Sequence, residues 1–72
     1  MSRLANANVT SRVVRALKRF GFEEYAGSKH TIMTHPDGRY TTVPRHPRIN
    51  PMLLKKILKQ CGIGEDEFIR NY

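Results

Sequence analysis

Two short β-capable segments stand on either side of a Pro36-Asp37-Gly38 tripeptide, and this arrangement constrains the fold more than any other part of the chain. Proline presets the backbone φ angle and glycine tolerates a positive one, so the tripeptide is typical of a tight turn. The spacing predicts that His30–His35 pairs with Tyr40–Val43, which is rich in β-branched and aromatic residues. A strand at Phe22–Tyr25 would complete an antiparallel meander.

Helical patterns flank the predicted meander on both sides. The helix before it has apolar residues at helical spacing, with Thr10 or Ser11 as the expected N-cap and Gly21 at its end. The helix after it should begin at Asn50, a good N-cap followed by proline, and end at Gly62. The predicted apolar stripes are Val13, Val14, Leu17 and Phe20 in the first helix, and Leu53, Leu54, Ile57, Leu58 and Cys61 in the second.

These elements predict an α+β fold with the order α-β-β-β-α. The chain has 72 residues, too few for two cores, so we expect one domain over residues 1–72 with residues 1–9 as a flexible N-terminal extension. One more helical turn is expected at Gly64–Ile69, where Phe68 is available to the core. Cys61 is the sole cysteine, which excludes an internal disulfide.

Positive charge is the main compositional signal of function. The chain has 13 Lys and Arg against 6 Asp and Glu, a formal net charge of +7. Such a charge attracts polyanions before specific contacts form, so RNA, DNA, an anionic membrane or an acidic protein could be the partner. No segment approaches the roughly 20 apolar residues of a membrane span, and the first residues lack the apolar region of a secretory signal. We therefore expect a cytoplasmic protein that does not bind membranes.

All three histidines lie between Gly27 and Pro47, close in sequence to three cations. Histidine can take and give protons near neutral pH, and arginine can hold a phosphate with two parallel hydrogen bonds. Each residue alone is explained equally well as an ordinary surface side chain, but their clustering suggests chemistry on a nucleic acid. The histidines are His30, His35 and His46, and the cations are Lys29, Arg39 and Arg45.

Other uses of these residues are less favoured. A zinc site is not expected, because no carboxylate or thiol joins the histidines at ligand spacing. We therefore predict neither a metal nor a cofactor. Three aromatic residues could stack on bases, but with 8% aromatic residues in the chain core packing is the preferred interpretation. They are Phe22, Tyr25 and Tyr40.

The pieces His35-Pro36-Asp37-Gly38-Arg39 and Val43-Pro44-Arg45-His46 are specific at this spacing, whereas any single piece would be weak. Together with residues 17–22, 27–30 and 54–63, and in this chain order, they resemble the HicA/YcfA-like toxins. The resemblance runs from about Ser11 to Phe68.

The resemblance implies a fold like that of double-stranded-RNA-binding domains (dsRBD-like), with two helices packed on one face of a three-stranded antiparallel sheet. Members are mRNA interferases of type II toxin-antitoxin systems, and a HicB antitoxin covers their active site. Their catalytic residue is a histidine at the start of the second strand, usually after Gly-Ser or Gly-Gly. His30 matches that position, and Lys29 stands where the family usually has Ser or Gly.

The resemblance and the residues together predict a metal-independent endoribonuclease. His30 would take the proton of a 2′-hydroxyl, whose oxygen attacks the adjacent phosphorus to form a 2′,3′-cyclic phosphate. The proton donor to the leaving 5′-oxygen is left open. Tyr40, His35 and His46 are the candidates, and cleavage without a dedicated acid is the other alternative. The expected partners are single-stranded mRNA and a HicB-like antitoxin, with the free protein a monomer. The alternatives are a non-catalytic RNA-binding module and a small protein that docks an acidic partner. The expected RNA-binding residues are Ser28, Lys29, Arg39, Arg45 and His46.

Overall fold

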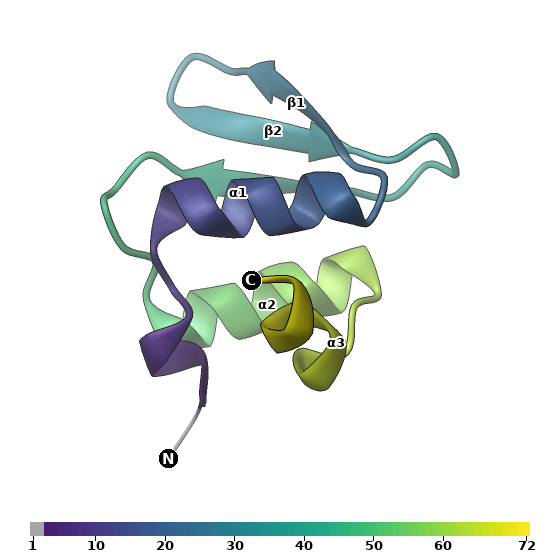
Figure 1. Ribbon diagram of the computed structural model, residues 1–72. Helices are drawn as coiled ribbons and strands as arrows, with labels where there is room; N and C mark the ends of the chain where they lie inside the picture. The colour runs from purple at the N-terminus through teal and green to yellow at the C-terminus, as the bar shows by residue number, and fades with distance from the viewer. Residues whose placement is uncertain (1–2) are drawn as a thin grey trace.

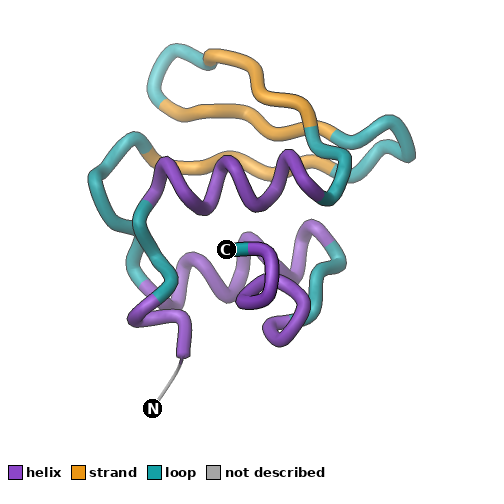
Figure 2. Tube along the Cα trace, in the orientation of Figure 1, coloured by secondary structure: helices purple, strands orange, loops and turns teal. Residues whose placement is uncertain are grey.

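The computed structural model describes residues 3–72 and contains one three-stranded antiparallel sheet with helices on one face (Figures 1 and 2). The predicted α+β class and α-β-β-β-α order are confirmed. A short 3-10 helix that was not expected precedes them, and a third α-helix follows them where one more helical turn was expected. The elements are η1 (Arg3–Asn6), α1 (Thr10–Arg19), β1 (Glu23–Ala26), β2 (His30–Thr34), β3 (Tyr40–Pro44), α2 (Pro51–Cys61) and α3 (Glu65–Asn71).

The register of the sheet decides which side chains meet the helices. The strand order is β1-β2-β3, and His30 pairs with Pro44 at one end of β2 while Thr34 pairs with Tyr40 at the other. Successive side chains of a strand point to opposite faces. Met33 and Val43 are fully buried on the helix-covered face, so His30 and Tyr40 belong to the opposite face. That second face, on the far side of the sheet from α1 and α2, is called the open face below (Figure 1).

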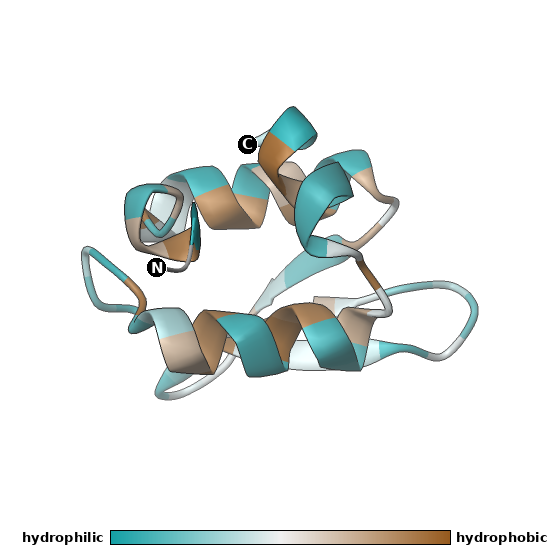
Figure 3. Cartoon of the chain, turned by 90° about the horizontal axis from the view of Figure 1, so that it is seen from below, coloured by the Kyte–Doolittle hydropathy of each residue, from teal (hydrophilic) through white to brown (hydrophobic). Residues whose placement is uncertain are grey.

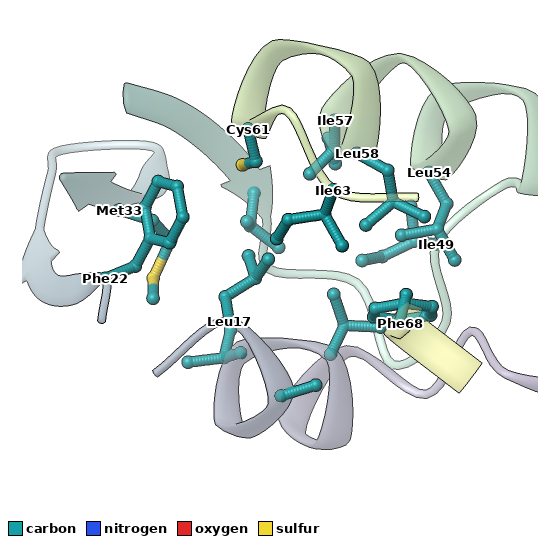
Figure 4. Close-up of a cluster of buried hydrophobic side chains, with 14 of the residues drawn as sticks. Leu17, Phe22, Met33, Ile49, Leu54, Ile57, Leu58, Cys61, Ile63 and Phe68 are labelled. Carbon is teal, nitrogen blue, oxygen red and sulfur yellow. The ribbon is translucent and has the colours of Figure 1, made fainter. Parts of the chain in front are cut away.

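The core lies between the sheet and the helices (Figure 4). Leu17 of α1, Leu54 of α2 and Phe68 of α3 are all fully buried within it, and the apolar segments of the helices face inward (Figure 3). Leu53, which was expected in the stripe of α2, is instead 39% exposed. It falls at the edge of the buried face, because Leu54, Ile57, Leu58 and Cys61 at positions i, i+3, i+4 and i+7 already fill that face.

The start of the chain departs from its prediction. Leu4 of η1 is fully buried and Ala7 nearly so, and the Asn8 amide donates to the Ile49 carbonyl at 2.9 Å. Residues 3–9 therefore pack into the domain and do not form the expected flexible extension, since their apolar side chains complete the core beside α2. Residues 1 and 2 lie outside the described part of the chain.

The two long helices begin in different ways. Asn50 caps α2 as predicted, because its side chain accepts the Met52 N–H at 2.8 Å, and Gly62 ends that helix with a φ of +67°. Neither Thr10 nor Ser11 caps α1, whose N-cap is Val9. The Thr10 hydroxyl donates instead to the His46 carbonyl, and the Thr10 N–H donates to the Pro47 carbonyl at 3.0 Å. The start of α1 is thus fastened to the loop after β3.

Candidate active site

His30 stands at the mouth of a tight hairpin. It is the first residue of β2 and follows the exposed loop residues Ser28 and Lys29. The Gly27 N–H donates to the His30 carbonyl at 2.9 Å, which closes the hairpin. The exposed His30 side chain lines a shallow hollow on the open face, together with Gly27, Ser28, Lys29, Ile32 and Thr42. A proton-transfer group and a cation therefore border one hollow that a ligand can reach.

Two residues fix the backbone beneath His30. A Cβ atom at Gly27 would lie 2.6 Å from the His30 carbonyl oxygen, so the hairpin has no room for a side chain there. Arg45 follows β3 and donates from one guanidinium nitrogen to the Gly27 carbonyl at 2.5 Å and to the His30 carbonyl at 3.3 Å. Arg45 was expected to contact RNA, but in the structure its guanidinium holds the hairpin together. Arg45 thereby fixes the position of His30.

Replacing Gly27 with alanine should displace the hairpin. Removing glycine usually stabilises a protein by about 0.4–1 kcal/mol through the unfolded chain, but forcing a methyl group into a filled space costs about 1–3 kcal/mol. The second effect should win, because the obstructing atom belongs to the backbone. We expect a lower urea midpoint and a shifted His30 amide resonance, with Ser28→Ala in the same loop as the control. Equal midpoints for the two variants would refute this role of Gly27.

The second histidine lies at the opposite end of the strand. His35 is five residues beyond His30, about 16 Å along an extended chain. Its Nδ1 accepts the Asp37 N–H at 3.2 Å and lies 3.0 Å from an Asp37 carboxylate oxygen, and its ring meets the edge of Phe22 at 5.1 Å between centroids. His35 therefore orients the turn between β2 and β3, and it is too distant to donate a proton beside His30.

Arg39 belongs to this turn as well. Its Nε donates to an Asp37 carboxylate oxygen at 2.8 Å, its guanidinium donates to the Cys61 carbonyl, and it lies over the Phe22 ring at 5.3 Å. The backbone N–H and then the side chain of Arg39 hold the pKa of the Asp37 carboxyl below its usual value. Arg39 thus joins the turn to the end of α2, and the structure does not bring it to the hollow at His30 as the sequence suggested.

His46 lines a different hollow, between α1 and the covered face of the sheet. The same hollow is bordered by Arg15, by Arg45 and by Lys18, whose ammonium pairs with the Glu24 carboxylate at 2.7 Å. The three histidines therefore occupy three separate places. Within residues 3–72, no three His, Cys, Asp or Glu side chains gather in a way that could hold a metal ion.

Cys61 is a structural residue and not a reactive thiol. Its side chain is fully buried in the core under α2. Burial raises the pKa of the Cys61 thiol to about 11, so the thiol stays protonated and inert near neutral pH.

The sequence interpretation missed two aromatic residues on the open face. Tyr25 is 52% exposed and Tyr40 is 66% exposed, whereas Phe22 is buried as expected. The assignment of both tyrosines to the core is therefore wrong. Strand alternation could have indicated this for Tyr40. Thr41 and Val43 are two residues apart and lie on the covered face, so Tyr40, one residue before Thr41, must lie on the opposite face. The Tyr25 hydroxyl donates to the Glu23 carboxylate at 2.6 Å, an interaction that raises the pKa of Tyr25.

Comparison with known proteins agrees with this geometry. Residues 10–63, more than half of the chain, match a family model described as the HicA toxin of bacterial toxin-antitoxin systems. No individual curated protein matches the chain. The match and the fold define a toxin of a toxin-antitoxin system, a class that implies an antitoxin partner. The chain belongs to the HicA toxin family, which confirms the resemblance.

The family match ends before α3, and it begins after η1. Both flanking elements contribute fully buried side chains, Leu4 and Phe68, so the domain extends beyond the matched residues at each end. None of the helices among residues 3–72 has the length and apolar character needed to cross a membrane.

Proposed function

We propose that this toxin is an mRNA endoribonuclease that works without a metal ion, with His30 as the general base. The observation that carries the proposal is the position of His30: exposed, at the start of β2, on a hairpin held by Gly27 and Arg45, in a chain of the HicA toxin family. A rigidly held base on an accessible face suits a long polymeric substrate better than a small molecule, which requires an enclosing pocket.

The reaction uses the groups around one hollow. The His30 imidazole takes the proton of a 2′-hydroxyl, the 2′-oxygen bonds to the adjacent phosphorus, and the bond from phosphorus to the 5′-oxygen breaks. The products are a 2′,3′-cyclic phosphate and a 5′-hydroxyl, which takes its proton from solvent. The ammonium of Lys29, which borders the same hollow, stabilises the charge that develops on the phosphoryl oxygens, and the Ser28 hydroxyl donates to them.

Four of the residues considered from the sequence have no chemical step in this proposal. His35 and Arg39 are engaged in the turn about 16 Å away, and Tyr40 lies about 14 Å from His30 by strand geometry. His46 borders the hollow beside α1. A HicB-like antitoxin would inhibit the enzyme by covering the open face around His30. The free toxin would act on mRNA in the cytoplasm as a monomer.

Incubation of labelled single-stranded RNA with the protein and a chelator tests this function. We expect shortened products that end in a 2′,3′-cyclic phosphate. The same RNA with 2′-O-methyl groups should stay intact, because it lacks the proton that His30 removes. Intact RNA that migrates as a shifted band would overturn the nuclease and support a non-catalytic RNA-binding module. An absence of RNA binding at low salt, where phosphate attraction is strongest, would support a purely protein-docking role.

A further inference from the structure

We propose that Tyr25 and Tyr40 form a base-stacking platform that holds single-stranded RNA across the open face of the sheet, beside His30. The inference rests on the proposed function, because it assigns the substrate-binding surface of that same site. Nothing in the candidate mechanism uses either tyrosine. The proposal concerns single-stranded RNA, whose unpaired bases can lie flat on aromatic rings.

Exposure of the two rings is the first observation. Tyr25 and Tyr40 are the most exposed aromatic side chains among residues 3–72, and each stands on a strand and not in a loop. A strand fixes the direction of a side chain more firmly than a loop does, so each ring is presented on a rigid support. The third tyrosine, Tyr72, packs against Phe68 and Arg12 on the helical side of the molecule.

The register places both rings on the same face as His30. Tyr25 pairs with Ile32, and Tyr40 pairs with Thr34, while Ile32 and Thr34 share the face of His30 by strand alternation. Tyr25 is therefore the diagonal cross-strand neighbour of His30, about 8 Å away, and Tyr40 lies about 14 Å from it. An extended strand of RNA bound at His30 would bring successive bases over this face within reach of both rings.

Charge and polarity favour RNA as the occupant of this face. Ile32 and Thr34 of β2 lie between the two rings, and Thr42 stands beside Tyr40 on β3. The two threonines interrupt the apolar surface, so the tyrosines and Ile32 do not form the continuous apolar patch that a protein core contact requires. The hairpin end of the same face carries the exposed Lys29. The charge on this face is mixed, because the Glu23 carboxylate accepts from the Tyr25 hydroxyl while Lys29 stands at the hairpin end. In a nucleic-acid surface of this kind the rings stack on the bases and the cation, here Lys29, holds a phosphate.

The chain supplies its own probe for this platform. It contains three tyrosines and no tryptophan, so its intrinsic fluorescence comes from tyrosine. Titration with a single-stranded 2′-O-methyl RNA, which the enzyme cannot cleave, should quench that emission. Tyr25→Ala and Tyr40→Ala should each weaken binding by about 5- to 150-fold, the effect of losing one stacked base. Tyr25→Phe keeps the ring and should bind like the wild type, and circular dichroism should show that every variant is folded.

The outcomes separate this inference from the proposed nuclease. Unchanged affinity in both alanine variants would overturn the platform even if RNA is cleaved normally. Binding of the 2′-O-methyl RNA that weakens in both alanine variants would uphold the platform even if no RNA is ever cut, since that RNA has no reactive 2′-hydroxyl. Alanine variants that lose affinity for the antitoxin but not for RNA would also overturn it, and would assign the rings to the protein partner.

Discussion

Replacing His30 with alanine is expected to lower the rate of RNA cleavage by about 10²- to 10⁴-fold, the contribution of one general base. The fold should survive, because the hydrogen bonds from Gly27 and Arg45 go to the backbone carbonyl of His30, which alanine retains. The side chain itself is exposed, so its removal leaves no cavity in the core. Single-turnover cleavage of labelled RNA by the two proteins, with their circular dichroism spectra compared, measures this effect.

His46→Ala provides the matched control for the histidine at the site. His46 is also exposed but lines the hollow beside α1, so its loss should change the cleavage rate far less than the loss of His30. Two results would contradict the assignment of His30. One is cleavage that continues at the wild-type rate in His30→Ala, and the other is cleavage by the wild type that stops when a chelator removes divalent metals.

Replacing Phe68 with alanine is expected to destabilise the domain by about 3–5 kcal/mol, the usual cost of removing a buried phenylalanine ring. Phe68 is fully buried and belongs to α3, outside the part of the chain that matches the family model. A domain of 72 residues has a total unfolding free energy of only about 4–11 kcal/mol, at about 0.05–0.15 kcal/mol per residue. The substitution should therefore remove at least about a quarter of the unfolding free energy of the domain.

Urea unfolding followed by circular dichroism measures the cost of the Phe68 change. Met52→Ala is the control, because Met52 is 77% exposed on α2 and its truncation should alter the unfolding free energy by no more than about 0.5 kcal/mol. If the Phe68 and Met52 variants unfold at the same urea concentration, α3 does not contribute to the core in solution. The same comparison can be made with Leu4→Ala at the other end of the chain.

Local patterns predicted most of the elements and only some of their ends. Asn50 and Gly62 delimit α2 as expected, because an N-cap side chain and a left-handed glycine act within one turn of the backbone. The start of α1 could not be predicted in this way. Thr10 has the chemistry of an N-cap, but its hydroxyl bonds to the His46 carbonyl, a partner that arrives only when the loop after β3 folds against α1.

The same limit applies to the chain ends. Residues 3–9 contain few strong helical or strand signals, so a flexible extension was the natural expectation. Leu4 and Ala7 are buried because the surface beside α2 needs apolar side chains to cover it, and that need is visible only once α2 and the sheet are assembled. The assignment of both open-face tyrosines to the core failed for a related reason, since composition does not reveal which face of a sheet the helices cover.

By itself, the sequence determined the order of elements, the turn at residues 36–38, the basic character of the protein and the choice of His30 by family resemblance. Only the tertiary structure decided what Arg45 and Arg39 contact. Antiparallel pairing brings residue 45 back to residues 27 and 30, and it leaves residues 35 and 39 together at the far end of the sheet. His35 and Arg39 were thereby separated from His30, although all three lie within ten residues of sequence. The physical reason is that an extended strand places five residues about 16 Å apart, while the reversal at the turn brings the far ends of the two strands together.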